Sequence, residues 1–189
     1  MKNEKIINII KKYGYLALLG VGILGLILVI VFTSTPTQEQ PVDQPVNANK
    51  LTFGLPVLDA TVSKSFDDKK LQYNETLNQY EIHLGMDFKA VANSDVYAVL
   101  DGTVSEIYND YLEGTVVVIS HANNFKSVYG SLGENVTLKV GDAVKKGDVV
   151  GKVSSSSAGE LNMGNHLHFE LLENDVEVDP AGYLNIQDK

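Results

Sequence analysis

The sequence has no cysteine and no arginine among its 189 residues. Without cysteine no disulfide can hold a folded domain together, so its stability must come from a packed core, and thiols reveal nothing about the compartment. Without arginine the positive charge rests on 15 lysines, against 24 carboxylates, which gives a formal net charge of −9. The chain is therefore acidic, and its length allows one folded domain plus accessory segments.

One long hydrophobic run is present, at residues 13–32, and it contains no charged side chain. About 20 helical residues cross a hydrocarbon core of about 30 Å, so we predict a transmembrane helix. The alternative is a cleaved signal peptide, whose apolar core usually has about 7–15 residues and ends at a small-residue site that Thr33-Ser34-Thr35-Pro36 does not offer. Residues 1–12 carry four lysines and one glutamate, which predicts a cytoplasmic tail and an extracytoplasmic location for the rest of the chain.

The segment after the hydrophobic run, residues 33–50, is rich in Pro, Gln, Asn and Thr. It cannot bury enough apolar surface to fold, so we predict a semi-extended linker that leads to one folded domain over residues 51–189. From residue 33 onward the chain has 11 lysines and 23 carboxylates. This excess of 12 negative charges disfavours nucleic-acid binding, and it suits either a basic protein partner or a simply solvated surface.

Short β-rich segments separated by turn dipeptides such as Asp101-Gly102 predict an all-β domain. Strands are expected at residues 96–99, 103–108, 115–120, 125–129, 136–140 and 149–153, with a hairpin between 65 and 80. Residues 51–57 are expected to form an edge strand or an extended approach, since Pro56 cannot donate to a ladder. No amphipathic helix of useful length follows residue 33, so we predict an antiparallel β-sandwich or open barrel.

The candidate functional residues are histidines and one aspartate. His166 and His168 are two positions apart in a predicted strand, so their side chains share one face. Upstream, His83 and Asp87 lie four positions apart. If the fold brings the two stretches together, two imidazole nitrogens and one carboxylate can bind Zn²⁺ and leave its fourth position to water. His121, in Ser120-His121-Ala122, is expected to be a loop residue without a ligand role.

These motifs, in this order, resemble the M23 family of zinc metallopeptidases, also called LytM domains. The resemblance extends from about residue 53 to 183 and includes Gly85-Met86-Asp87 and the closing Asn165-His166-Leu167-His168-Phe169-Glu170. It implies a zinc ion bound by His83, Asp87 and His168, a catalytic imidazole at His166, and cleavage of peptide cross-links in bacterial cell wall.

The chain departs from the family at one catalytic position. Family members place a second catalytic imidazole in a Tyr-x-His-Leu strand, which here reads Tyr129-Gly130-Ser131-Leu132. Ser131 is too short to replace an imidazole and has no base beside it in the sequence, and loss of a general acid-base group costs about 10²–10⁴ in rate. We therefore expect a metal site without peptidase activity, or with very little.

The anchor, the linker and the single degenerate domain together resemble the stage II sporulation protein Q branch of this family. Residues 68–88 are similar to the stretch before the metal motif in that branch, where loss of the histidine is typical. The resemblance implies a forespore-membrane protein whose outer domain binds an ectodomain like that of stage III sporulation protein AH, on the facing membrane, and so supports engulfment and an intercellular channel. We expect docking at an edge strand such as 53–57 or 115–120, or in the former peptide groove, and a structural role for zinc.

Two alternatives stay open at this stage. The first is an active zinc endopeptidase on peptidoglycan, in which His166 works alone or with an unrecognised helper. The second is a cell-wall binder that activates another hydrolase without cutting. The sequence also leaves open whether copies of the chain form a ring.

Overall fold

The structure, a computed structural model, describes residues 51–184 and 186. The predicted tail, transmembrane helix and linker lie outside these residues. Within the described part, no helix is long and apolar enough to span a bilayer.

The described residues form short strands and three single turns of 3₁₀ helix. In chain order the strands are β1 (Thr61–Lys64), β2 (Asp67–Asn74), β3 (Gln79–His83), β4 (Met86–Lys89), β5 (Asp95–Tyr97), β6 (Gly102–Asp110), β7 (Gly114–His121), β8 (Phe125–Leu132), β9 (Ala143–Val144), β10 (Val149–Lys152), β11 (His166–Glu173) and β12 (Val176–Val178). The 3₁₀ turns are η1 (Ala122–Asn124), η2 (Leu161–Met163) and η3 (Pro180–Gly182).

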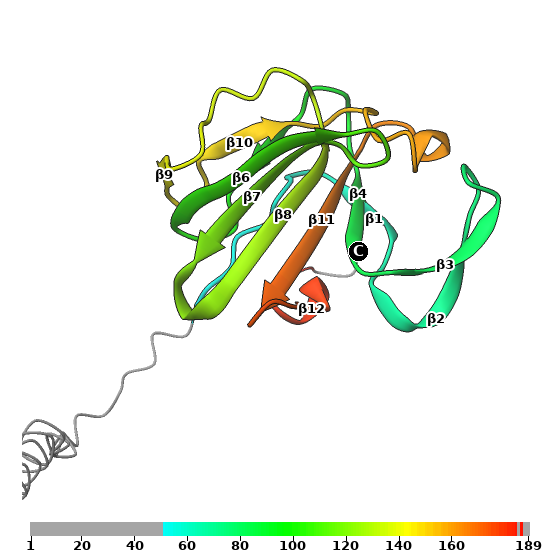
Figure 1. Cartoon of the computed structure of the whole chain (residues 1–189), viewed down its shortest axis with the longest axis horizontal. Coiled ribbons are helices and arrows are strands. Elements are labelled where there is room, and N and C mark those ends of the chain that lie inside the picture. The colour runs from blue at the N-terminus through cyan, green and yellow to red at the C-terminus, as the bar shows by residue number, and fades with distance from the viewer. Residues whose placement is uncertain (1–50, 185, 187–189) are drawn as a thin grey trace, which may run out of the picture. The chain divides into compact units, whose positions relative to one another are not determined.

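One antiparallel sheet dominates the architecture, in the order β1-β4-β11-β8-β7-β6-β9, with β12 paired to β11 (Figure 1). Two smaller pairs, β5 with β10 and β2 with β3, complete the fold. The predicted all-β, antiparallel fold class is thereby confirmed. Within the sheet β4 lies against β11, in a register that sets Asp87 opposite His168.

The hydrophobic core joins the main sheet to the β5–β10 pair. Val96 of β5 and Val150 of β10 are buried in one cluster with Leu167 and Phe169 of β11. Because side chains alternate along a strand, burial of these two β11 residues turns His166 and His168 to the opposite face. The Phe169 ring packs edge-to-face on Tyr129 with centroids 5.3 Å apart, which adds to the burial energy of both rings.

Most predicted strands are confirmed, but the strand expected at residues 136–140 is wrong. Val136 and Leu138 do pack against the core, so the apolar alternation reflects burial. Pairing with β6 begins only after this segment, where the Gly141 N–H donates to the Val104 carbonyl at 2.9 Å. The period-two pattern therefore marked an extended, half-buried chain without a ladder partner.

Neither segment proposed for docking is an edge strand of the main sheet. Residues 51–57 approach β5 without forming a strand: Val57 and Val96 form an isolated bridge, and the Gly54 N–H donates to the Val99 carbonyl at 2.8 Å. Pro56 lacks the N–H that a ladder needs. Residues 115–120 belong to β7, which lies between β6 and β8. Among the described strands, the margins of the sheet are β1, β9 and the short β12, which pairs with β11 alone.

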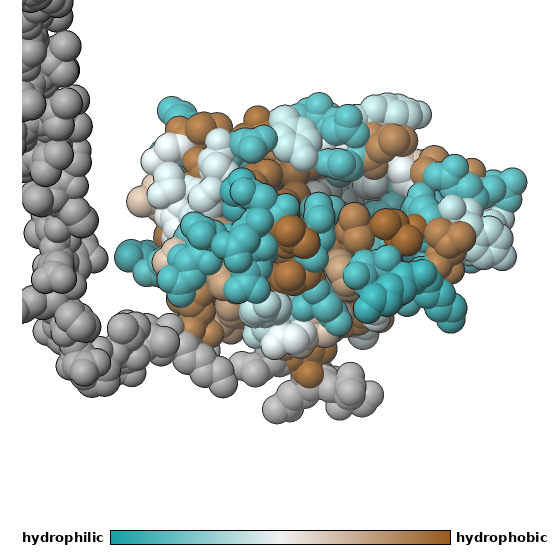
Figure 2. Space-filling view, turned by 60° about the horizontal axis from the view of Figure 1, so that its bottom comes forward, coloured by the Kyte–Doolittle hydropathy of each residue, from teal (hydrophilic) through white to brown (hydrophobic). Residues whose placement is uncertain are grey.

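The β2–β3 hairpin projects from the main sheet (Figure 1). It also exposes apolar side chains. Leu71, Tyr80 and Ile82 are 56%, 68% and 45% exposed. At this end of the domain, Figure 2 shows hydrophobic groups interspersed with hydrophilic ones. The hairpin therefore presents exposed apolar side chains among the charged residues of β2.

Candidate metal centre

The candidate site forms where the end of β3, the strand β4 and the strand β11 meet. His83 ends β3, and Asp87 of β4 lies opposite His168 of β11. Gly85, in the connection between β3 and β4, allows this close approach. A β-carbon there would lie 2.6 Å from His168 Cε1 and 3.0 Å from the Phe169 carbonyl oxygen, so a larger residue would push the imidazole away.

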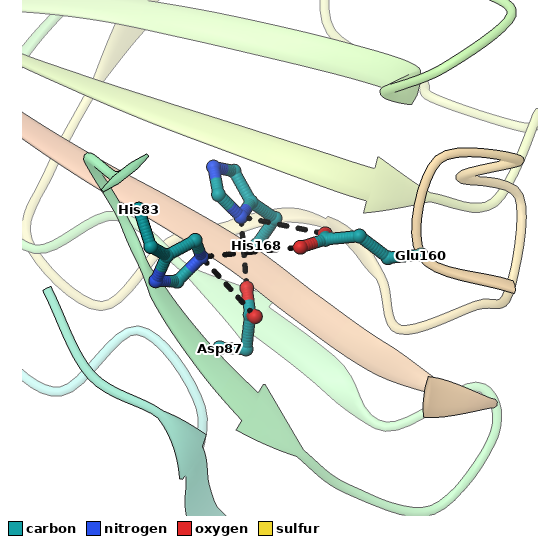
Figure 3. Close-up of side chains that lie close together, drawn as sticks. All are labelled: His83, Asp87, Glu160 and His168. Atoms are coloured by element: carbon teal, nitrogen blue, oxygen red, sulfur yellow. Dashed lines mark hydrogen bonds and ion pairs between the residues drawn. The ribbon is translucent and has the colours of Figure 1, made fainter. Parts of the chain in front are cut away.

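Three of the residues singled out in the sequence lie within contact distance of one another (Figure 3). His83 Nε2 is 3.2 Å from Asp87 Oδ2, and His168 Nδ1 is 2.8 Å from Asp87 Oδ1. Asp87 is fully buried and His83 is only 4% exposed. A carboxylate and two imidazoles are therefore gathered in a space with little access to water.

The outward-facing nitrogen of each imidazole has its own partner. His83 Nδ1 lies 3.0 Å from the Ser65 carbonyl, and His168 Nε2 lies 3.2 Å from Glu170 Oε1. A ring that donates its outer N–H to such a partner presents a lone pair on the other nitrogen. This is the arrangement that orients histidines for metal binding.

The polar atoms inside the site do not satisfy one another. His83 Nε2 and Asp87 Oδ2 are both buried and lack a hydrogen-bond partner among the described residues, despite their 3.2 Å separation. A buried polar group without a partner costs about 1–3 kcal/mol. A cation between a lone-pair nitrogen and a carboxylate oxygen satisfies both atoms, so this donor set fits Zn²⁺.

Two pKa values reflect the same crowding. Burial by itself raises the pKa of the Asp87 carboxyl, but the hydrogen bond with His168 and the close contact with His83 outweigh burial and hold that pKa well below its usual range. Burial lowers the pKa of His168. The hydrogen bonds with the carboxylates of Asp87 and Glu170 outweigh burial and raise that pKa to well above its usual value. Both shifts reflect the close contact between His168 Nδ1 and Asp87 Oδ1 at 2.8 Å.

Glu160 joins this group, although the sequence analysis did not single it out. Its Oε1 is 3.9 Å from His83 Nε2, and its Oε2 is 3.5 Å from His168 Nδ1. One ligand atom each from His83, Asp87, Glu160 and His168 all lie within 4.8 Å of one another. Glu160 comes from the loop before η2 and follows no metal-ligand spacing, so only the fold reveals it.

His166 lies on the same face of β11 and is fully buried. Its Nδ1 is 2.8 Å from the Gly164 carbonyl, and its Nε2 is 3.2 Å from Glu160 Oε2. Burial lowers the pKa of this imidazole, but the bonds to Glu160 and Gly164 outweigh it and raise the pKa above its ordinary value. Both ring nitrogens are therefore already engaged by the chain.

Ser131 is buried near this site without taking part in it. Its hydroxyl donates to the Ser154 carbonyl at 3.3 Å, and the same carbonyl accepts the His166 backbone N–H at 3.0 Å. Ser131 has φ of 56°, a left-handed conformation in which histidine is enriched among non-glycine residues. The backbone thus suits an imidazole at this position, and the side chain present is a short hydroxyl.

The fourth histidine lies elsewhere. His121, at the end of β7, contacts the Asp101 carbonyl through Nδ1 at 3.0 Å and the Ser127 hydroxyl through Nε2 at 2.7 Å. The Ser127 hydroxyl in turn donates to Tyr129 at 3.0 Å. His121 therefore anchors a buried hydrogen-bond chain away from the candidate metal centre.

Comparison with known proteins agrees with this geometry. The model of peptidase family M23 matches residues 81–180. Stage II sporulation protein Q of Bacillus subtilis (strain 168) is 36% identical over 110 residues, which cover 57% of this chain and 38% of that protein. The peptidoglycan DD-endopeptidase ShyC of Vibrio cholerae serotype O1 is 30% identical over 139 residues, which cover 73% of this chain and 31% of that protein. The matches thus span well under half the length of these relatives.

Solved structures give the same result. The structure of the SpoIIQ–SpoIIIAH pore forming complex aligns with a TM-score of 0.62 and 29% identity, covering 71% of this chain and 92% of that chain. A zinc containing peptidase from Vibrio cholerae aligns with a TM-score of 0.59 and 28% identity, covering 69% of this chain and 39% of that one. The residues matched by the family model, 81–180, make up more than half of the chain, so the chain belongs to peptidase family M23.

Proposed function

We propose that the chain is a membrane-anchored M23-domain protein of endospore formation that keeps a metal centre but does not hydrolyse peptidoglycan. In this proposal residues 13–32 anchor it in the forespore membrane, and residues 51–189 face the space between the two membranes. The likeness to stage II sporulation protein Q, at 36% identity, supports the sporulation role.

Ser131 is the observation that carries the non-hydrolytic half of the proposal. Peptide hydrolysis at a metal centre needs a base for the attacking water and a donor for the tetrahedral oxyanion, and Zn²⁺ supplies Lewis acidity and a water with a pKa near 7. Ser131 stands where the family carries one of these imidazoles, and its buried hydroxyl is bonded to the Ser154 carbonyl. The second imidazole of the family corresponds to His166, whose two ring nitrogens are already hydrogen-bonded to Gly164 and Glu160.

His83, Asp87 and His168 would hold the metal. The site joins β4 and β11 to the β2–β3 hairpin, because His83 ends β3 and the Ser65 carbonyl that orients it precedes β2. A metal bound there stabilises the attachment of the hairpin, since its binding free energy adds to the folding free energy. Its role in the proposal is therefore structural.

The partner we propose is a membrane-anchored ectodomain like stage III sporulation protein AH, as in the complex of the structural relative. The β1 edge of the sheet and the exposed apolar side chains of the β2–β3 hairpin are the surfaces we assign to it, because an open sheet edge beside apolar groups favours strand addition. The hairpin carries Leu71, Tyr80 and Ile82 for such a contact.

Two assays test the absence of hydrolysis and the binding of the partner separately. Incubation of the zinc-loaded full chain with purified cross-linked peptidoglycan should release no muropeptides, beside an active M23 endopeptidase as positive control. Co-purification with the partner's ectodomain should succeed for the unaltered chain and weaken for Tyr80→Ser, which removes exposed apolar area from the hairpin. Muropeptide release would support the active endopeptidase instead. Retention on peptidoglycan without partner binding would support a cell-wall binder that activates another hydrolase.

A further inference from the structure

The fourth position of a zinc site distinguishes a hydrolytic centre from a structural one. Catalytic zinc sites use three protein ligands and leave the fourth position to water, whereas structural sites have four protein ligands. Glu160 Oε1 lies 3.9 Å from His83 Nε2, and its Oε2 lies 3.5 Å from His168 Nδ1. A carboxylate thus already faces both nitrogens at which a metal would bind.

The spacing of the four groups suits one tetrahedral ion. Metal–ligand distances of about 2.0–2.1 Å at a tetrahedral centre place ligand atoms about 3.3 Å from one another. The contacts of Asp87 are 3.2 Å to His83 and 2.8 Å to His168. Those of Glu160 are 3.9 Å and 3.5 Å to the same two rings. Each pair of distances runs to the two different oxygens of one carboxylate. With one oxygen from each carboxylate, the four ligand atoms lie within 4.8 Å of one another, so they would draw together around a bound ion.

The backbone around Glu160 is held in place from two directions. The Gly159 N–H donates to the Leu112 carbonyl at 3.0 Å in the turn between β6 and β7, and the Gly159 carbonyl accepts from Asn74 Nδ2 at 3.1 Å. Four residues after Gly159, the Met163 N–H donates to the Glu160 carbonyl at 2.9 Å. The carboxylate is therefore presented by a fixed loop.

The side chain of Glu160 is positioned as well. Its Oε1 lies 3.7 Å from Lys64 Nζ, with the two side chains only 12% and 11% exposed. Its Oε2 lies 3.2 Å from His166 Nε2. A carboxylate that binds a metal through one oxygen keeps the other for such a bond, so His166 can serve as an outer partner of the ligand.

We infer that Glu160 is the fourth protein ligand of the metal, so that side chains complete the coordination and no position is left for a catalytic water. The inference rests on the metal site of the proposed function and deepens it. It makes the centre structural by its own ligand set, independently of Ser131. The alternative, that Glu160 serves only as the ion-pair partner of Lys64 and His166, predicts an open fourth position.

Cobalt(II) substitution of the full chain in detergent micelles tests this without measuring activity. Azide occupies an open position on the metal and changes the visible absorption spectrum of Co²⁺. We expect azide to leave the spectrum of the unaltered protein unchanged, and to alter that of Glu160→Ala. An azide-dependent spectrum of the unaltered protein, with one cobalt bound, would overturn the inference while leaving the metal site itself intact.

Zinc affinity, measured by competition with a chromophoric chelator, gives the second readout. Glu160→Gln should weaken zinc binding by about 10-fold or more, since even outer-shell partners contribute about 10–100-fold. The control is Glu81→Gln, because Glu81 pairs with the same Lys64 at 3.6 Å but its carboxylate belongs to no metal-binding group among the described residues. Equal affinities for both variants would refute a ligand role for Glu160. Absence of any stoichiometric metal in the unaltered chain would instead overturn the proposed metal site, and the inference with it.

Discussion

Removal of the metal should destabilise the domain by an amount that follows from the buried atoms of the site. His83 Nε2 and Asp87 Oδ2 are buried and have no hydrogen-bond partner among the described residues. If the metal is their partner, its loss leaves two unsatisfied groups at about 1–3 kcal/mol each, or about 2–6 kcal/mol together. A ligand at 1,000 times its dissociation constant stabilises by about 4 kcal/mol, which falls in the same range.

Thermal unfolding of the zinc-loaded full chain, with and without a chelator, measures this effect. For a domain of this size 1 kcal/mol moves the midpoint by roughly 4 °C, so the chelator should lower it by about 8 °C or more. His83→Gln should lack most of this shift, because it removes a ligand. His121→Gln should keep the whole shift, because His121 contacts Asp101 and Ser127 instead. An unchanged midpoint for the unaltered chain would refute a structural role for the metal.

Three further predictions concern other parts of the domain. Tyr129→Phe removes the hydroxyl that accepts the Val99 N–H at 3.0 Å in the core. Chemical denaturation should therefore show a free energy of unfolding lower by about 1–3 kcal/mol. A decrease below about 0.3 kcal/mol would contradict this prediction. Burial lowers the pKa of His121, so the stability that its neutral form provides above about pH 6.5 is lost as the pH falls through its folded-state pKa. His121→Gln should therefore flatten this part of the curve of unfolding free energy against pH. An identical slope for the variant and the unaltered chain would contradict this prediction. Gly85→Ala places a β-carbon 2.6 Å from His168 Cε1. Zinc affinity, measured by chelator competition, should therefore fall by about 10-fold or more. Unchanged affinity would show that the His168 ring can move away freely.

The sequence predicted the fold class because the strand signals were local. Alternating apolar residues and turn dipeptides such as Asp101-Gly102 lie where the strands begin and end, and β6 to β8 follow them closely. The same reasoning failed at residues 136–140, where alternation reflects burial without a partner strand. Sequence periodicity reports which side chains are buried, but ladder pairing depends on which segments become neighbours in the fold.

The candidate site divides in the same way. The pairs His83 with Asp87 and His166 with His168 have short spacings that a sequence displays directly. Glu160 has no such spacing, and it reaches the site only because bonds to residues 74 and 112 hold its loop. A side chain placed by long-range contacts leaves no local pattern, so the sequence did not indicate that a fourth possible ligand lies beside the other three.

The edge strands illustrate a third limit. Residues 115–120 read as a good strand, but whether a strand lies inside or at the margin of a sheet depends on the order of all the strands. The structure places β7 between β6 and β8 and leaves β1 and β9 at the margins.

The central claim is that a metal centre persists in a chain that has lost hydrolysis, and one assay tests it most directly. The full chain is loaded with zinc, its metal content is determined, and the same sample is incubated with cross-linked peptidoglycan. The account predicts one zinc per chain and no released muropeptides. Steady release of muropeptides that a chelator abolishes would contradict it.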